Sequence, residues 1–240
     1  MNNCMTFPIF HSASCTVSSI FFDDTTCYDK SFEKLEHDYA YILKNHCFCN
    51  KRKKEFLAGR YCGKKAIENL LESENASVIE INSDGTPKWP VGIVGTITHT
   101  RNLAGAAVGF SKNLQGIGID YESILSIDRA NYLKDSILTK KESTYFLKNE
   151  KMSFNVLCTA IFSAKESVFK CVYPLIQEYF EADKIDILEL DVLANCFKFR
   201  FSDELQNITN DFEFAGYWCC VNDKYICTLV EMRKIKRAFY

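Results

Sequence analysis

The sequence predicts an α+β fold made of two similar α/β lobes, and three observations lead to that prediction. The chain has 240 residues, enough to bury a sizeable core as one large domain or two small ones. Each half runs from two helices into strands. A polar turn begins at Lys112, which places an N-terminal lobe at residues 1–115 and a C-terminal lobe at residues 116–240. We expect the functional site to lie between these lobes.

The first half is predicted to contain two helices followed by two long strands. Residues 31–46 and 53–71 have apolar side chains at helical spacing. Residues 84–87 read Asp-Gly-Thr-Pro, which has the composition of a turn. Strands are expected at residues 91–100 and 103–110, where glycines permit a close approach of other backbone segments.

The second half begins with one strand and then again runs from helices into strands. A first strand at residues 114–122 precedes a short helix that Thr139 and Glu142 open as a capping box. A longer helix is expected at residues 155–172, ending before Pro174. Four strands complete the prediction, at residues 185–190, 196–201, 212–221 and 225–232.

Composition excludes several classes of protein. Hydrophobic residues make up 47% of the chain and charged residues 25%, which is ordinary for a soluble globular protein. The net charge of −2 argues against a general nucleic-acid binder. No apolar run approaches the roughly 20 residues that a membrane helix needs, so we expect no membrane span. The N-terminal residues do not resemble a secretory signal, which favours a cytoplasmic location.

The 12 cysteines raise the alternatives of disulfides or a zinc site. The pairs at positions 47 and 49 and at positions 219 and 220 do not have the two-residue spacing of a zinc knuckle. Several other cysteines stand among apolar residues, where a free thiol packs as a small hydrophobe. We therefore expect reduced thiols, as is usual in the cytoplasm.

Three carboxylates and a lysine are candidates for a common site. Asp120 and Glu122 stand two residues apart near the end of a predicted strand, so their side chains share one face. Glu166 and Lys170 stand four residues apart on one face of a predicted helix. Such a set suits a divalent cation that holds a phosphate. Spacing alone equally allows Glu166 and Lys170 to form a surface ion pair worth about 0.3–0.5 kcal/mol.

A basic helix and a strand junction offer further candidates for phosphate binding. Three cations stand at spacings of eight and four residues, which return to nearly the same side of a helix. They are Arg52, just before the predicted helix at residues 53–71, and Arg60 and Lys64 within it. Thr98 and His99 lie at the junction of two glycine-containing strands. The alternatives are a solvated helix face for the cations and a structural role for Thr98 and His99, and the spacing does not decide between them.

Five segments of the sequence form an ordered set: Phe56-Leu-Ala-Gly-Arg-Tyr-Cys-Gly-Lys-Lys-Ala66, Gly85-Thr-Pro-Lys-Trp-Pro90, Gly95-Thr-Ile-Thr-His99, Gly118-Ile-Asp-Tyr-Glu122 and Phe162-Ser-Ala-Lys-Glu-Ser-Val-Phe-Lys170. Together they resemble the 4′-phosphopantetheinyl transferases of the Sfp type, most closely the enterobactin synthase component D branch. They occur in the order and at the separations usual in that family. Lys64 stands where the family's basic helix has arginine, which keeps the charge but loses the planar fork.

The resemblance implies that the chain adopts the pseudo-twofold fold of this family and transfers the 4′-phosphopantetheine arm of coenzyme A to a serine of a carrier protein. It implies Mg²⁺, with Mn²⁺ as the alternative ion, bound by Asp120, Glu122 and Glu166. Glu166 would also take the serine proton, and Lys170 and Asp120 would complete the catalytic set. The residues implied in coenzyme A binding are Arg52, Arg60, Lys64, Thr98, His99, Lys165 and Lys170.

The implied partner is an apo carrier protein, or a carrier domain of a peptide, polyketide or fatty-acid synthetase, with a leaning towards siderophore synthesis. A monomer is expected because one chain already pairs two lobes. Two alternatives remain open at this point. One is a metal-dependent phosphodiesterase or nuclease, which also uses acidic pairs near a lysine. The other is an inactive module that binds coenzyme A or a carrier.

Overall fold

The structure is a computed structural model of the chain. It divides the chain into two compact units, Met1–Ser111 and Lys112–Tyr240. Each unit contains both helices and antiparallel strands, which confirms the predicted α+β class. The residues that the structure describes are 4–5, 10, 14–22, 30–45, 48–74, 76–146 and 152–236.

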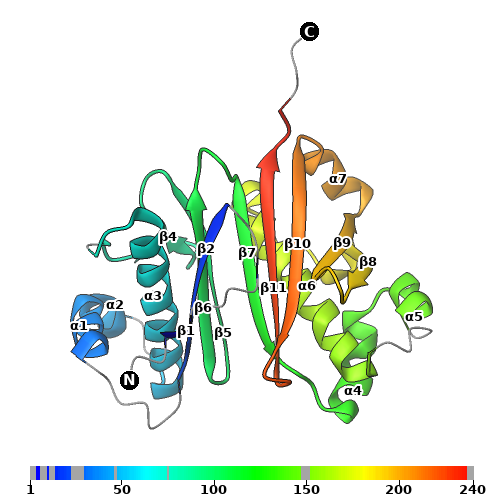
Figure 1. The fold of residues 1–240 in the computed structure, drawn as a ribbon, viewed down its shortest axis with the longest axis horizontal. Coiled ribbons are helices and arrows are strands. Elements are labelled where there is room, and N and C mark those ends of the chain that lie inside the picture. The colour runs from blue at the N-terminus through cyan, green and yellow to red at the C-terminus, as the bar shows by residue number, and fades with distance from the viewer. Residues whose placement is uncertain are drawn as a thin grey trace. The chain divides into compact units, whose positions relative to one another are not determined.

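A four-stranded antiparallel sheet forms the centre of the first unit, and its strand order is β1-β2-β6-β5. The long helix α3 (Asn50–Leu71) packs against β2, β5 and β6 (Figure 1). The strands are β1 (Cys4–Met5), β2 (Cys15–Phe21), β5 (Ile93–Thr100) and β6 (Leu103–Phe110). A small hairpin joins β3 (Glu80–Ile81) to β4 (Pro87–Lys88), and its turn confirms the prediction at residues 84–87.

The single helix predicted for residues 31–46 is wrong, because the structure contains two helices, α1 (Lys30–Asp38) and α2 (Ala40–Asn45). Tyr39 separates them. Its buried hydroxyl accepts a hydrogen bond from the backbone N–H of Ile79 at 2.8 Å. This contact with a distant segment cannot be read from helical spacing. Position 46, where the predicted helix was to end, lies outside the described residues.

A five-stranded antiparallel sheet forms the second unit, in the order β7-β11-β10-β9-β8. The helix α6 (Phe154–Ile176) packs against β7 and β11 and lies behind them in Figure 1. All five predicted strands are confirmed to within a few residues. They are β7 (Gly116–Ser123), β8 (Ile185–Asp191), β9 (Cys196–Phe201), β10 (Phe212–Val221) and β11 (Tyr225–Lys234).

The predicted end of the long helix before Pro174 is wrong. Helix α6 continues through Pro174 to Ile176 and ends at Gln177, which adopts a left-handed conformation with φ of 56°. A proline inside a helix costs about 3 kcal/mol through its missing N–H and its steric clash. Packing offsets that cost, since Val172 is fully buried and Ile176 contacts the same core.

The structure also contains elements that the sequence did not predict. Helix α4 (Ile127–Ile137) begins at Ser126, whose hydroxyl accepts from the backbone N–H of Arg129 at 3.3 Å. Only Ala130 and Ile137 of this helix are buried, so its apolar periodicity is weak. The 3₁₀ turn η1 (Ala182–Lys184) and α7 (Asp203–Thr209) were not predicted either. The short helix predicted after Thr139 is confirmed as α5 (Lys140–Phe146).

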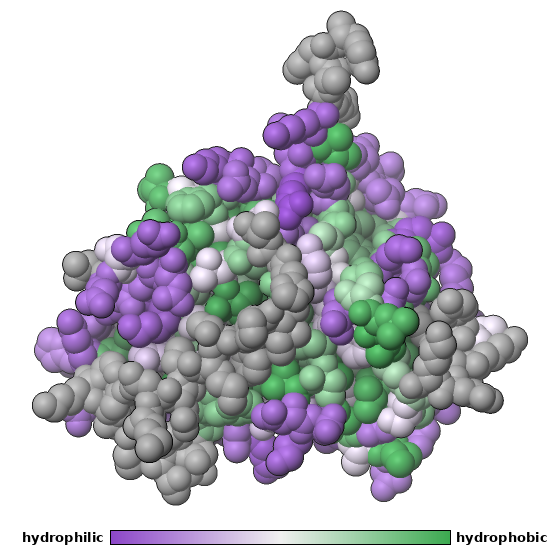
Figure 2. Space-filling view, viewed as in Figure 1, coloured by the Kyte–Doolittle hydropathy of each residue, from purple (hydrophilic) through white to green (hydrophobic). Residues whose placement is uncertain are grey.

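The visible surface carries both polar and apolar side chains (Figure 2). Figure 2 shows hydrophilic side chains interspersed with smaller apolar patches over the visible face. Among the described helices, none combines the length and the apolar character that a membrane crossing requires. The cysteines whose side chains are described, including the buried Cys158, Cys171 and Cys227, are free thiols.

Candidate active site

The candidate site of the second unit is built on β7. Side chains of alternate residues along a strand share one face, so Asp120 and Glu122 lie on the same face as Gly116 and Gly118. That face is covered by α6. Ser163 on α6 contacts the backbone carbonyl of Asp120 through its hydroxyl, at 3.4 Å. The predicted carboxylates therefore project beneath the helix that carries Glu166 and Lys170.

Two glycines allow α6 to approach β7 closely. A Cβ atom added at Gly118 would lie 1.7 Å from the carbonyl oxygen of Ser167 and 2.7 Å from the backbone nitrogen of Cys171. At Gly116 it would lie 2.3 Å from the carbonyl oxygen of Cys171. No other residue fits these positions without moving the helix, so the glycines fix how near the side chains of α6 come to Asp120.

Lys170 and Asp120 form a partly buried ion pair across this contact. The Nζ atom of Lys170 donates to Oδ1 of Asp120 at 2.6 Å and to the carbonyl oxygen of Ile119 at 3.4 Å. Asp120 is only 3% exposed. The sequence spacing had allowed Lys170 to pair with Glu166 on the helix surface. In the structure Lys170 instead pairs with Asp120, which joins α6 to β7.

The two glutamates are held in an environment that disfavours their charge. Burial, together with the charges of Asp120 and Glu166, raises the pKa of Glu122 to about 7 against the opposing effect of Lys170. Burial likewise raises the pKa of Glu166, with Lys170 lowering it and Asp120 raising it. A bound cation would relieve both the burial and the repulsion among these carboxylates.

The donor set suits a hard cation with oxygen ligands. Mg²⁺ is usually bound by one or two carboxylates, with substrate phosphates and waters as its other ligands. In the part of the chain that the structure describes, no three His, Cys, Asp or Glu side chains are arranged to hold a metal ion. The structure thus does not arrange Asp120, Glu122 and Glu166 as a metal site by themselves, and their assignment as Mg²⁺ ligands stays a prediction.

The raised pKa of Glu122 predicts that stability falls as the pH rises. The folded protein retains the Glu122 proton up to a pH of about 7, whereas the unfolded chain loses it near 4.5. The contribution is therefore complete below pH 4.5 and lost as the pH rises through 7. We expect Tm to fall by about 3 °C between pH 5 and pH 8 in metal-free buffer, measured by circular dichroism.

The variant Glu122→Gln is the control for this pH dependence, because its amide does not titrate. Its Tm should change less over the same range. Adding Mg²⁺ at pH 8 should raise the Tm of the unaltered protein more than that of the variant. Equal pH dependence and an equal response to Mg²⁺ in the two proteins would contradict the assignment of Glu122 to a cation site.

The first unit brings together Arg52, His99 and a residue that the sequence did not indicate, Glu55. Arg52 Nη1 lies 2.5 Å from His99 Nε2. Because a guanidinium only donates, Nε2 accepts and the ring proton lies on Nδ1. That atom is 3.7 Å from Oε2 of Glu55, which also lies 3.5 Å from Arg52 Nη1. Glu55 could have been found from the sequence, because it stands three residues after Arg52 and such residues are neighbours on one helix face.

The other predicted phosphate ligands of the first unit lie apart from this trio. Arg60 is only 4% exposed, and its guanidinium carbon lies 4.9 Å from the centre of the Phe56 ring. Burial lowers the pKa of Arg60 to about 10. Thr98 is buried and, being next to His99 on a strand, faces the opposite side of the sheet. Lys64 lies half-buried on α3.

Comparison with known proteins follows the division into two units. The family model "4′-phosphopantetheinyl transferase N-terminal domain" matches residues 42–109, and the model "4′-phosphopantetheinyl transferase superfamily" matches residues 116–230. The 4′-phosphopantetheinyl transferase Npt of Nocardia iowensis is 30% identical over 189 residues, which span 75% of this chain and 82% of Npt. The chain belongs to the 4′-phosphopantetheinyl transferase family.

Relatives within this family include enterobactin synthase component D of Escherichia coli strain K12, which is 39% identical over 120 residues. That match spans 50% of this chain and 54% of the relative, so the chain matches about half the length of the enterobactin synthase proteins. Among solved structures, the Chronobacterium ammoniagenes ACPS–CoA complex covers 50% of this chain and 98% of its own, at 16% identity and a TM-score of 0.40. This structural likeness is too weak for positions to be compared.

Lys165, which the family resemblance assigns to coenzyme A binding, forms internal contacts in the structure. Its side chain is buried inside the second unit, and its Nζ atom donates to Glu142 at 2.8 Å and to the carbonyl oxygen of Ile137 at 2.9 Å. Both donations point away from solvent, and the role of Lys165 in coenzyme A binding stays a prediction. The sequence motif contains a lysine at this position, but the motif does not show whether that side chain faces the interior of the unit or the candidate site.

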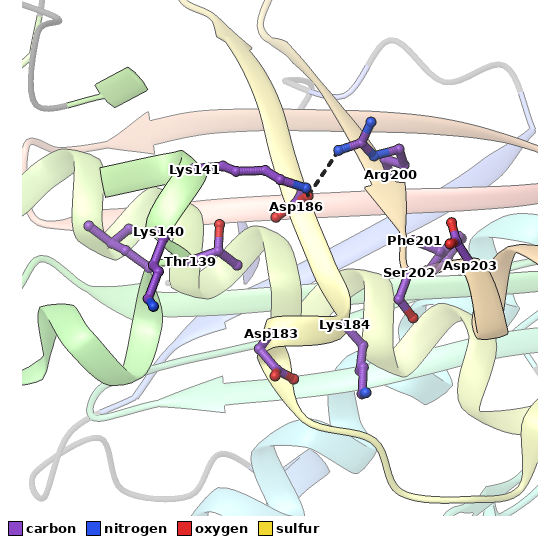
Figure 3. Close-up of a pocket in the computed structure, with 11 residues that line it drawn as sticks. Thr139, Lys140, Lys141, Asp183, Lys184, Asp186, Arg200, Phe201, Ser202 and Asp203 are labelled. Carbon is purple, nitrogen blue, oxygen red and sulfur yellow. Dashed lines mark hydrogen bonds and ion pairs between the residues drawn. The ribbon is translucent and has the colours of Figure 1, made fainter. Parts of the chain in front are cut away.

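A separate cavity of about 740 Å³ lies in the second unit, between the start of α5 and the ends of β8 and β9 (Figure 3). Lys141 and Arg200 both point to Asp186, with distances of 3.3 Å and 3.1 Å to its Oδ2 atom. Lys140, Lys184, Asp183 and Asp203 bring two further charges of each sign to the lining. The balance of charges does not favour a nucleotide or any other strongly anionic ligand.

Proposed function

We propose that the protein transfers the 4′-phosphopantetheine arm of coenzyme A to a serine hydroxyl of an apo carrier protein. The serine oxygen would form a bond to the phosphorus next to the pantetheine, and the pyrophosphate bond would break to release adenosine 3′,5′-bisphosphate. The observation that carries this proposal is the convergence of Asp120, Glu166 and Lys170 on one face of β7, in a chain of this family.

Each residue of the second unit has a role that follows from its surroundings. Glu166 would take the serine proton, since a raised pKa brings a carboxylate closer to the working pH of a general base. Lys170, fixed by Asp120, would stabilise the negative charge that builds on the leaving phosphate. Mg²⁺ bound by Asp120, Glu122 and Glu166 would supply further neutralisation of phosphate charge.

The first unit would bind the phosphates of coenzyme A. Arg52 and His99 are the best-supported residues, because they contact one another and Glu55 limits the rotation of both side chains. Lys64 would add a point charge from the same helix. Arg60 and Thr98 complete the set that the family resemblance implies, although both are buried in the structure.

The carrier we propose is a carrier domain of a peptide synthetase that makes a siderophore. The enterobactin synthase relatives support this choice over polyketide or fatty-acid synthetases. We further propose that the protein acts as a monomer in the cytoplasm, in line with the free thiols of the described cysteines.

Release of adenosine 3′,5′-bisphosphate tests the proposed reaction. With coenzyme A, Mg²⁺ and an apo carrier, the nucleotide should appear in proportion to the carrier supplied. A carrier whose acceptor serine is replaced by alanine is the control and should yield none. If the nucleotide is released equally with the alanine carrier, the protein hydrolyses coenzyme A as a phosphodiesterase instead. Cleavage of nucleic acid in Mg²⁺, abolished by Asp120→Ala, would favour the nuclease alternative.

A further inference from the structure

A buried ion pair joins α5 to α6 at Lys165, the residue before Glu166. The Nζ atom of Lys165 donates to Oε2 of Glu142 at 2.8 Å, and the two side chains are 2% and 1% exposed. Lys165 also donates to the carbonyl oxygen of Ile137 at 2.9 Å. The proposed reaction uses neither side chain, which leaves the role of this pair to be explained.

Both oxygens of the Glu142 carboxylate are engaged. Besides Lys165, Oε2 accepts the backbone N–H of Thr139 at 2.7 Å, and Oε1 accepts the backbone N–H of Ile187 at 2.7 Å. One carboxylate therefore connects the start of α5, the strand β8 and the middle of α6. This connection is independent of the packing of α6 on β7.

Stability alone is a weak explanation for this pair. A buried ion pair loses its hydration, and replacing such a pair by apolar side chains of similar volume is often neutral or stabilising. Apolar contacts, unlike hydrogen bonds, do not require a particular orientation of the side chains. The donors of Lys165 meet two fixed acceptors, on Glu142 and Ile137, and so fix one rotation of α6 about its axis.

Lys165 immediately precedes Glu166 on this helix. Successive residues of an α-helix are about 100° apart around its axis, so holding Lys165 on one side sets the direction of Glu166. One turn further along, Lys170 contacts Asp120 at 2.6 Å. The contacts of Lys165 on one side and of Lys170 on another thus fix the rotation of α6 about its axis. Glu166 lies between these two residues around the helix.

We propose that Glu142 is a positioning residue for the transfer reaction, holding Lys165 so that α6 directs Glu166 towards the carboxylates of β7. Glu142 does not touch the substrate in this role. The proposal rests on the proposed function, because its effect is observed as phosphopantetheine transfer. Small displacements of reacting groups are costly, with a shift of about 1 Å lowering a rate by about 100-fold.

The test compares three variants of the full chain in the carrier assay. We expect Glu142→Gln to lower kcat by about 100-fold while the KM for coenzyme A changes by less than about 3-fold. Glu142→Leu combined with Lys165→Met removes both buried charges, and we expect it to match the unaltered protein in Tm but to keep a low kcat. Lys141→Met is the matched control, since it breaks an exposed ion pair one residue away on α5 and should leave kcat unchanged.

The paired substitution separates positioning from stability. If its Tm and its kcat both match those of the unaltered protein, the pair is only structural and the proposal fails. The proposal also fails if Glu142→Gln raises the KM for coenzyme A at unchanged kcat. Should Glu142→Gln not fold, the paired variant decides alone. If the unaltered protein modifies no carrier, the proposed function itself is refuted, and this proposal with it.

Discussion

Replacing Glu166 with glutamine is expected to lower kcat for phosphopantetheine transfer by about 1,000-fold, with little change in the KM for coenzyme A. Glutamine keeps the size of the side chain but can neither accept the serine proton nor offer a charged ligand to a cation. Glu166 is one of three carboxylates near Lys170, and its raised pKa is compatible with a role as proton acceptor. Binding of coenzyme A should survive because the proposed phosphate ligands lie in the first unit.

The measurement is steady-state transfer at saturating Mg²⁺, with coenzyme A affinity determined separately by calorimetry. Glu178→Gln provides the matched control, since Glu178 is exposed just beyond the end of α6. Its kcat should equal that of the unaltered protein. A Glu166→Gln variant that retains at least a third of the normal turnover would remove Glu166 as both the base and an essential ligand.

Replacing Gly118 with alanine is expected to lower the free energy of unfolding by about 3 kcal/mol or more. The added Cβ atom would lie 1.7 Å from the carbonyl oxygen of Ser167 and 2.7 Å from the nitrogen of Cys171. Both are backbone atoms of α6, so relief requires the helix to move away from β7. That movement would also withdraw Glu166 and Lys170 from Asp120.

Urea unfolding followed by circular dichroism measures this loss. Gly92→Ala is the control, because a Cβ there meets no atom within 4 Å and costs only its positive φ of 86°, about 1–2 kcal/mol. The account also predicts that the fraction of Gly118→Ala that remains folded transfers more slowly than the unaltered protein. A Gly118→Ala variant as stable as Gly92→Ala would show that α6 does not depend on this close approach.

Patterns local to the sequence predicted most of the fold. The strands of the second unit follow from alternation, and the capping box of α5 is present, with Glu142 N–H donating to the Thr139 hydroxyl at 3.2 Å. The failures have tertiary causes. Packing carries α6 through Pro174, and the bond from Ile79 to Tyr39 accompanies the division between α1 and α2. Such contacts join residues far apart in the chain and leave no periodic signal.

The candidate site was predicted less completely than the fold. The strand face shared by Asp120 and Glu122 follows from alternation, and the structure adds the contact of Lys170 with Asp120. Motif spacing could not show that Lys165 turns inward to Glu142, because both sides of a helix are compatible with one motif. Glu55 was missed for a similar reason, since its contact with His99 depends on how α3 packs on β5.

The intact mass of an apo carrier domain tests the central proposal most directly. The carrier is incubated with the protein and coenzyme A, once with Mg²⁺ and once with a chelator. We predict that the carrier gains the mass of one phosphopantetheinyl arm on its acceptor serine only when Mg²⁺ is present. If no carrier domain from peptide, polyketide or fatty-acid synthetases gains this mass, the proposed function is contradicted.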